Sequence, residues 1–354
     1  MATYYVTEQT LSELICKKQG GDTFIPAPTK RLAWLDAAGE AASLQALRQV
    51  RAAQSPKGFF LPAAESMGRY GAKSSAATAV QTGSIVLVGV RACELRARTY
   101  LDKVMLAGDF ESPDYRARRE ATTIVSCDCV DCAETCCCTL VGGRPFATEG
   151  YDVNLTPLAE GFIADAASER GRQWLAAAGE GRLPEPGARQ LAERDELRKA
   201  MTERLRKQNA KFTFLADDET QPKLPNDADE AWQKFAADCV ECAACTNVCP
   251  TCHCFYLYDQ LLGPEAFERV RTWDSCLLST YHRMAGGPNM KLTPRPRLLS
   301  RLANRVLHKF TYSLEQYKLL GCVGCGRCID GCLGAIDIRQ VVQALGASER
   351  ELGQ

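Results

Sequence analysis

Histidine is scarce in this chain, which has only three: His253, His282 and His308. A catalytic metal site built on several histidines is therefore not expected. The chain also lacks a P-loop, and no G-x-G-x-x-G fingerprint follows a strand pattern. The sequence thus gives no signature of nucleotide binding.

Net charge is absent as well, since Lys plus Arg and Asp plus Glu both number 43. This balance does not indicate a nucleic-acid partner. No run approaches the roughly 18 apolar residues that a membrane span needs, and the first twenty residues do not resemble a secretory signal. Apolar residues make up 46% of the 354, so a sizeable core is expected, in about two domains.

Cysteine, by contrast, is abundant, with 19 residues gathered in a few segments. So large a chain with such clustering does not fit a secreted disulfide scaffold. Thiolates kept for metal binding predict a reducing cytoplasm, in an anaerobic setting.

Two cysteine runs have the spacing of 4Fe–4S sites. CVECAACTNVCP begins at residue 239, and CVGCGRCIDGC begins at residue 322. Each offers C-x2-C-x2-C-x3-C, and in two-cluster ferredoxins the fourth cysteine of a run binds the other cluster. Cluster one is then assigned to Cys239, Cys242, Cys245 and Cys332, and cluster two to Cys322, Cys325, Cys328 and Cys249. The alternative is a pair of structural zinc sites, which usually use two separated C-x2-C pairs.

An α/β pattern precedes these runs. Residues 84–90 and 122–127 are short β-branched runs, and residues 92–106 have helical periodicity. Strand, helix and strand predict a βαβ unit with a parallel sheet. The turn after the first strand and the segment after the second should meet at one sheet edge, where ligands gather in such folds.

Seven cysteines fall at that edge: Cys93, Cys127, Cys129, Cys132, Cys136, Cys137 and Cys138. They are enough for a third cluster, with a zinc site or reactive thiols as alternatives. The residues alone leave open which four bind.

The remaining patterns predict an α/β domain over residues 1–225 and a mostly α-helical dicluster, ferredoxin-like domain over residues 226–354. Strands are expected in 151–158 and 161–168, and helices in 10–18, 169–178 and 186–211. The insert between the two runs has helical signals at 255–263, 275–286 and 295–312. For its three cysteines, Cys252, Cys254 and Cys276, packing beside the clusters is favoured over a fourth metal centre.

Several motifs resemble the family that contains the A subunit of anaerobic sulfite reductase and the beta subunit of sulfhydrogenase. They are GVRACELRA, YRARRE, CAETCCCT, CPTCHCFYLYD, RTWDSC, MAGG, RVLHKF and CVGCGRC. The resemblance extends from about residue 56 onward. It implies a third cluster on Cys93, Cys127, Cys136 and Cys138, with Cys129, Cys132 and Cys137 as extra cysteines.

Two positions depart from the family pattern. Leu333 replaces the proline expected after the second run, and Pro288 stands where relatives tend to have histidine. Because that proline is not itself a ligand, the second cluster is still expected.

The resemblance implies a non-catalytic electron-transfer subunit of an oxidoreductase complex. Such a subunit relays electrons between a flavoprotein that uses NAD(P)H and a terminal redox subunit of the sulfite reductase, hydrogenase or heterodisulfide-reductase type. One alternative is a reductase that acts on substrate at a cluster with an open iron. Another is a protein whose clusters only hold the fold.

Overall fold

The computed structural model describes residues 2–17, 21–27, 34–37, 44–71, 74–76, 83–178, 183–214, 216–281, 283–284 and 293–346. Pro288 therefore lies outside the described residues. The chain divides into two compact units. The first comprises Met1–Pro56, Thr82–Lys211 and Val323–Gly326, and the second Lys57–Gln81, Phe212–Cys322 and Arg327–Gln354.

A seven-stranded sheet forms the centre of the first unit. Its strands are β1 (Ala2–Val6), β2 (Asp22–Pro26), β3 (Trp34–Asp36), β6 (Ile85–Val90), β7 (Thr122–Cys127), β8 (Val153–Pro157) and β9 (Phe162–Ala166). They lie in the order β1-β9-β8-β7-β6-β2-β3. The four central strands β2, β6, β7 and β8 are parallel, and the outer pairings are antiparallel. This mixed sheet confirms the predicted α/β character.

The predicted βαβ unit is present at the sheet centre. β6 leads into α4 (Ala92–Leu106), α5 (Pro113–Ala121) follows, and β7 returns parallel to β6. Leu87 lies opposite Ile124, and Val90 lies opposite Ser126. Because the two strands end side by side, Cys93 and the segment after Cys127 start from the same sheet edge.

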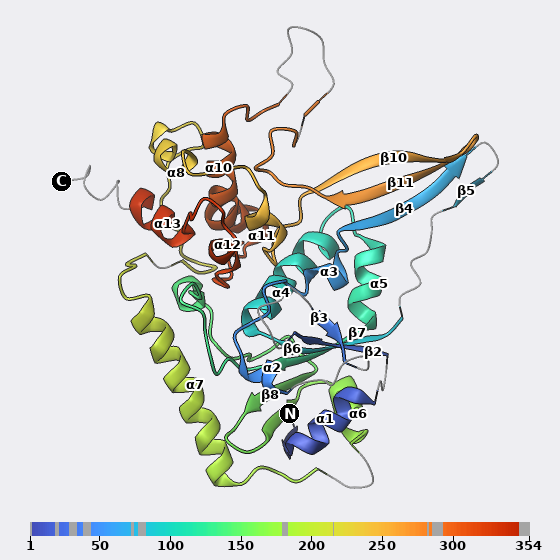
Figure 1. Ribbon diagram of the computed structural model, residues 1–354, viewed down its shortest axis with the longest axis vertical. Coiled ribbons are helices and arrows are strands. Elements are labelled where there is room, and N and C mark those ends of the chain that lie inside the picture. Colours follow the sequence, from blue (N-terminus) through green and yellow to red (C-terminus); the bar gives the residue numbers. More distant parts are fainter. Residues whose placement is uncertain are drawn as a thin grey trace. The chain divides into compact units, whose positions relative to one another are not determined.

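Helices cover both faces of this sheet (Figure 1). α1 (Glu8–Cys16) begins at Thr7, whose hydroxyl accepts the Thr10 backbone N–H as a helix cap. On the same face, α2 (Gln45–Arg48) and α6 (Glu169–Ala176) join α1 in a buried apolar core against β6, β7 and β8. The helix α7 (Ala188–Gln208) confirms the helix predicted over 186–211. The short helix η1 (Cys138–Val141) begins at the last cysteine of the cysteine-rich loop.

The second unit combines a four-stranded sheet with short helices. The sheet has the order β10-β11-β4-β5, with β4 (Ala64–Gly71), β5 (Ser74–Ala76), β10 (Phe255–Gly263) and β11 (Ala266–Trp273). The helices are α3 (Lys57–Phe60), η2 (Glu230–Trp232), α8 (Gln233–Ala236), α9 (Ala244–Asn247), α10 (Leu298–Leu307), η3 (His308–Tyr312), α11 (Ser313–Tyr317), α12 (Arg327–Asp330) and α13 (Ile338–Gly346). Because β4 pairs with β11, residues 57–81 belong to this unit, whereas the sequence predicts a single boundary near residue 225.

The prediction of a helix over residues 255–263 is wrong, because this segment forms the strand β10. Aromatic side chains such as Phe255, Tyr256 and Tyr258 favour a strand, and β11 supplies an antiparallel partner in which Phe255 lies opposite Trp273. The described residues after β11, 274–281, form turns and not the helix expected over 275–286.

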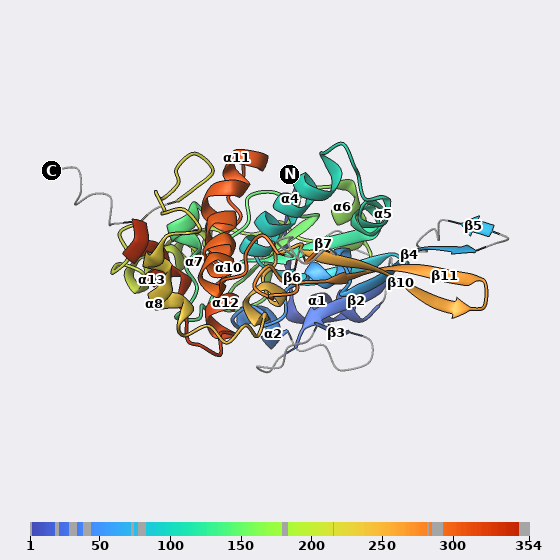
Figure 2. The ribbon, with the colours of Figure 1, turned by 90° about the horizontal axis from the view of Figure 1, so that it is seen from above.

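The helix expected over 295–312 is confirmed. α10, η3 and α11 follow one another without a break, and they form one helical column in Figure 2. The middle segment η3 is a π-helix, a form that is frequent at functional sites. It carries His308 and Lys309. Among the described residues, no helix is both long and apolar enough to cross a membrane.

Candidate metal centres

Cysteines from both runs line one pocket of the second unit. The first run contributes Cys239, Cys242 and Cys245, and the second contributes Cys328 and Cys332. The backbone wraps tightly here, with left-handed conformations at Glu241 (φ 53°) and Ala243 (φ 56°). The rest of the wall is mainly apolar: Val240, Leu277, Leu302, Val306, Ile336, Ile338 and Val341.

This pocket fits a 4Fe–4S cluster. It brings together the four cysteines assigned to cluster one, in an apolar setting that limits access of water. The Ile336 N–H donates a hydrogen bond to the Cys332 sulfur at 3.2 Å, and such N–H···S contacts tune cluster potentials. Leu333, which stands where a proline is expected, is exposed and leaves the Cys332 contact undisturbed.

A buried arginine adds positive charge to the pocket. Arg305 is 6% exposed, lines the pocket, and donates to the Cys245 carbonyl at 3.5 Å. Burial disfavours its charge, but nearby thiolates, first Cys245 and then Cys328, outweigh burial and raise the pKa of Arg305. A fixed cation therefore compensates the negative charge that four thiolates bring.

In the described part of the chain, no three His, Cys, Asp or Glu side chains converge closely enough to hold a single metal ion. A cubane needs a wider arrangement, because its four cysteines bind four separate irons.

The residues assigned to cluster two fall in both units. Cys249, Cys322 and Cys328 belong to the second unit, and Cys325 belongs to the first. Cys249 lies 3.3 Å from the Thr251 hydroxyl. Hydrogen bonding by Cys252, ahead of the positive charge of Lys309, lowers the pKa of Cys249. As a set, these four ligands remain a prediction.

Within the first unit, the second-run loop lies against the loop that carries CAETCCCT. The Gly324 carbonyl accepts the Cys137 N–H at 2.8 Å. The Cys136 sulfur lies 4.0 Å from the Cys325 carbonyl, and Cys93 packs against Val323 and Cys325. A predicted ligand of cluster two thus touches two predicted ligands of cluster three.

Two glycines permit this close approach. Gly324 (φ +64°) and Gly326 (φ +74°) both have left-handed backbones. A Cβ on Gly324 would stand 2.5 Å from the Cys138 Cα, and one on Gly326 would stand 2.4 Å from the Thr135 carbonyl oxygen. Only glycine fits at either position.

The structure separates the cysteines predicted for cluster three. Cys136 and Cys138 pack together with Cys129 and Cys132 beside α7. Cys127 instead lies in the apolar core and points its thiol at the Leu47 carbonyl, 3.5 Å away. Burial raises the pKa of Cys127 to about 11 and of Cys138 to about 12. A bound cation would be needed to hold either as a thiolate.

Arg91 fixes the sheet edge beneath these cysteines, and sequence reasoning missed it. It is 1% exposed. Its guanidinium donates to the carbonyls of Asp128 at 2.8 Å, Leu47 at 3.0 Å and Gln49 at 2.8 Å. Burial opposes its charge, but electrostatic interaction with Cys127 first and Cys129 next outweighs burial and raises the pKa of Arg91. One cation thus ties the turn after β6 to the segment after β7.

A second charged contact attaches α7 to the same edge. Asp128, whose side chain is 3% exposed, accepts from Arg198 at 2.7 Å, Thr156 at 2.6 Å and Asn154 at 3.0 Å. At the end of the helix, Asn209 donates to the Cys136 carbonyl at 2.9 Å. The cysteine-rich loop is therefore held from both sides.

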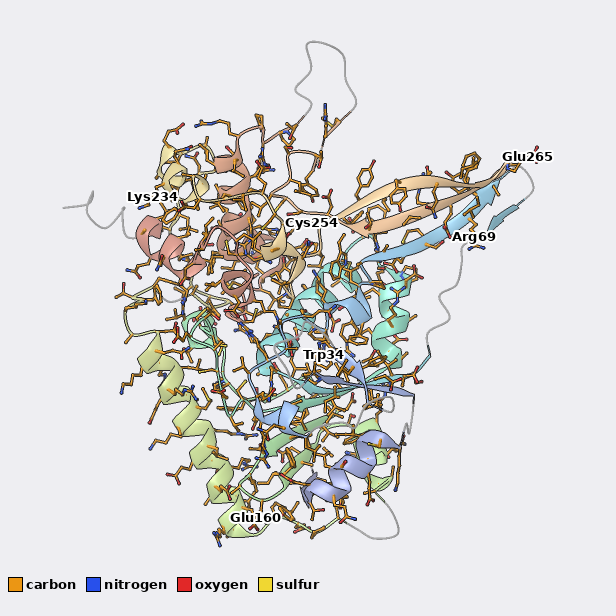
Figure 3. All side chains as sticks on the ribbon, viewed as in Figure 1. Trp34, Arg69, Glu160, Lys234, Cys254 and Glu265 are labelled. Carbon is orange, nitrogen blue, oxygen red and sulfur yellow. The ribbon has the colours of Figure 1, made fainter. Side chains whose placement is uncertain are left out.

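The three insert cysteines act on two different thiols of the second unit. Cys252 lowers the pKa of Cys249, whereas Cys276 lowers the pKa of Cys254. Cys254 lies directly before β10 (Figure 3), and its carbonyl accepts the Asp274 N–H at 3.0 Å. The C-x-C spacing of Cys252 and Cys254 did not indicate that the two cysteines have different partners.

Two buried lysines stand near these thiols. Lys57 and Lys309 are each 4% exposed. Lys57 donates to the Cys252 carbonyl at 3.0 Å and lies 3.9 Å from the centre of the Trp273 ring. Lys309 donates to the Thr251 hydroxyl at 2.6 Å. They come from segments far apart in the sequence, so no motif could have joined them.

Comparison with known proteins agrees with this site. A family model described as "4Fe-4S dicluster domain" matches residues 238–336. Over 286 residues, the chain is 31% identical to sulfhydrogenase 2 subunit beta of Pyrococcus furiosus, and the match covers 80% of each chain. No solved structure matches.

The dicluster domain and its cysteine-lined pocket define an iron–sulfur electron-transfer protein. More particularly, the chain belongs to the family of sulfhydrogenase beta subunits. This confirms the resemblance found in the sequence.

Proposed function

We propose that this chain is a subunit of an oxidoreductase complex and relays electrons between a flavoprotein that uses NAD(P)H and a terminal redox subunit. A relative named as a subunit supports assembly into a complex. A cytoplasmic location is part of the proposal, and nineteen free cysteines support it. The sulfite reductase, hydrogenase and heterodisulfide-reductase types all remain candidates for the terminal subunit.

The observation that carries the proposal is the pocket lined by cysteines of both runs. When bound, 4Fe–4S clusters take up and release single electrons. The chain's own residues hold these groups, keep water away with an apolar wall, and balance their charge with Arg305. No acid, base or nucleophile is needed for such a task.

We propose three clusters, with the first two on the eight cysteines of the two runs. For the third, Cys93, Cys136 and Cys138 are retained, and Cys129 competes with Cys127 for the fourth place. Packing beside Cys136 and Cys138 favours Cys129, whereas the Cys127 thiol is already satisfied inside the core.

The contact between the two loops supports a continuous route for electrons. In the first unit, Cys93 and Cys136 touch the segment of Cys325. The same C-x2-C loop continues along the chain to Cys328, which lines the pocket of cluster one. Three centres are thereby connected through one short stretch of sequence.

Replacement of Cys325 by alanine tests the relay in the complete complex. Cys325→Ala should abolish electron flow from NAD(P)H to the terminal subunit and leave dye-linked NAD(P)H oxidation by the flavoprotein intact. Cys16→Ala, at the exposed end of α1, is the matched control and should change neither activity. Loss of both activities in Cys325→Ala would show that the chain does more than conduct electrons.

A further inference from the structure

A buried hydroxyl joins the two cysteine runs inside the second unit. Thr251 is fully buried and follows Cys249 by two residues. Its hydroxyl oxygen lies 3.3 Å from the Cys249 sulfur, and the hydroxyl donates to the Gly321 carbonyl at 2.6 Å. That carbonyl belongs to the peptide bond of Cys322. One side chain therefore contacts a predicted ligand of cluster two and the peptide group that leads into another.

The oxygen of this hydroxyl also receives a hydrogen bond from a buried cation. Lys309 donates to it at 2.6 Å, and the Lys309 backbone carbonyl accepts the Gly321 N–H at 3.0 Å. Lys309 belongs to the π-helix η3, and π-helical turns are frequent at functional sites. The position of the ammonium group is thus fixed through both the side chain and the backbone.

Close packing holds both runs against η3. A Cβ on Gly321 would lie 2.8 Å from the Ser313 hydroxyl oxygen and 3.2 Å from the Lys309 Cα, and the Gly321 N–H also donates to the Ser313 hydroxyl at 2.8 Å. On the side of the first run, the His253 Nδ1 lies 3.1 Å from the Thr251 carbonyl oxygen. The end of the first run and the start of the second are therefore held in one arrangement around the Thr251 hydroxyl.

The hydrogen bonds of this hydroxyl depend on the state of Cys249. A hydroxyl has one hydrogen and two lone pairs. Lys309 uses one lone pair, and a Cys249 thiol can donate to the other while the hydroxyl hydrogen goes to Gly321. A Cys249 thiolate has no hydrogen to give, so its sulfur and the Gly321 carbonyl both attract the hydroxyl hydrogen. More negative charge on the sulfur draws that hydrogen toward Cys249.

We propose that Lys309 and Thr251 raise the reduction potential of cluster two. The inference rests on the proposed function, in which Cys249 and Cys322 are ligands of this cluster. Hydrogen bonds to the ligand sulfurs and nearby charge tune such potentials. The Lys309 ammonium polarises the Thr251 hydroxyl and strengthens its hydrogen bond to a negative sulfur. Both residues thus favour the reduced, more negative form, and no covalent bond changes because the hydrogen stays on Thr251.

Lys309 acts through Thr251 and is a positioning residue, so the test measures a potential. The full chain with its iron is titrated without oxygen and followed by electron paramagnetic resonance. Lys309→Met removes the charge and keeps an unbranched side chain. At the potential that half-reduces cluster two in the wild type, the reduced-to-oxidised ratio should fall at least about tenfold, which is a shift of about 59 mV to more negative potential.

Three more variants complete the test. Thr251→Val should shift the same centre in the same direction, whereas Thr251→Ser keeps the hydroxyl and should retain the wild-type potential. Lys318→Met is the matched control, because it removes an exposed lysine that directly follows α11 in the same helical column. It should change none of the potentials. The affected signal should be the one that Cys322→Ala removes or alters.

A fully loaded Lys309→Met or Thr251→Val protein with unchanged potentials would overturn the proposal, and so would a shift confined to another centre. Loss of four or more irons from either variant would overturn it as well, because the pair would then hold the cluster and not tune it. A wild-type protein without 4Fe–4S signals would instead refute the proposed function. Normal wild-type signals that neither change shifts would refute this inference alone.

Discussion

The contact between the two cysteine loops depends on Gly324, and alanine at this position should disrupt it. Alanine in a left-handed conformation costs about 1–2 kcal/mol. Its Cβ would also lie 2.5–2.6 Å from backbone atoms of Cys137 and Cys138, which is too close. If these atoms moved away, the hydrogen bond from the Cys137 N–H to the Gly324 carbonyl would weaken. Such a hydrogen bond contributes about 1 kcal/mol. We therefore expect Gly324→Ala to lose about 2–3 kcal/mol of stability.

Gly331→Ala is the matched control within the same run. A Cβ there would lie 3.4 Å from the Arg327 carbonyl oxygen and 3.8 Å from Val248, both ordinary contacts. Both proteins would be purified without oxygen and compared by thermal unfolding and iron content. Gly324→Ala should unfold at a temperature several degrees lower and hold less iron. Equal midpoints and equal iron would refute the close packing of the two loops.

Three further predictions concern other parts of the site. Asp128→Ala removes the partner that lies 2.7 Å from Arg198, leaves only Asp165 at 3.8 Å, and should reduce the free energy of unfolding in urea by about 3 kcal/mol. Asp195→Ala, at an exposed α7 position, should change it by less than about 0.5 kcal/mol. Equal effects of the two changes would contradict the role of the Asp128–Arg198 pair. Cys129→Ser should lose about four irons and Cys127→Ser none; the reverse would restore Cys127 as the ligand. Burial lowers the pKa of His253 to about 4 and of His308 to about 3. The unfolded state therefore binds more protons below about pH 6.5, and stability should fall as pH drops from 6.5 toward 4. The double variant with glutamine at both positions should lose this dependence, and an unchanged pH profile would contradict the lowered pKa values of the two histidines.

Much of the first unit could be predicted from its sequence, because its signals are local. The apolar β-branched runs became β6 and β7, and the periodic segment between them became α4 with the expected bounds. The cysteine spacing likewise predicted the dicluster domain that the family comparison confirms.

The features that could not be predicted depend on contacts between distant residues. β10 is a strand because β11 pairs with it, and β4 joins them from about 200 residues earlier. The sequence does not distinguish Gly324 from any other loop glycine, because its importance comes from the close approach of the loop that contains Cys138. The choice between Cys127 and Cys129 is also decided by packing, since both follow the same strand.

Iron and acid-labile sulfide analysis of protein purified without oxygen tests the central claim most directly. Three cubanes predict about twelve of each per chain. A value near eight would remove the third cluster, and a colourless protein loaded with zinc would contradict the whole account.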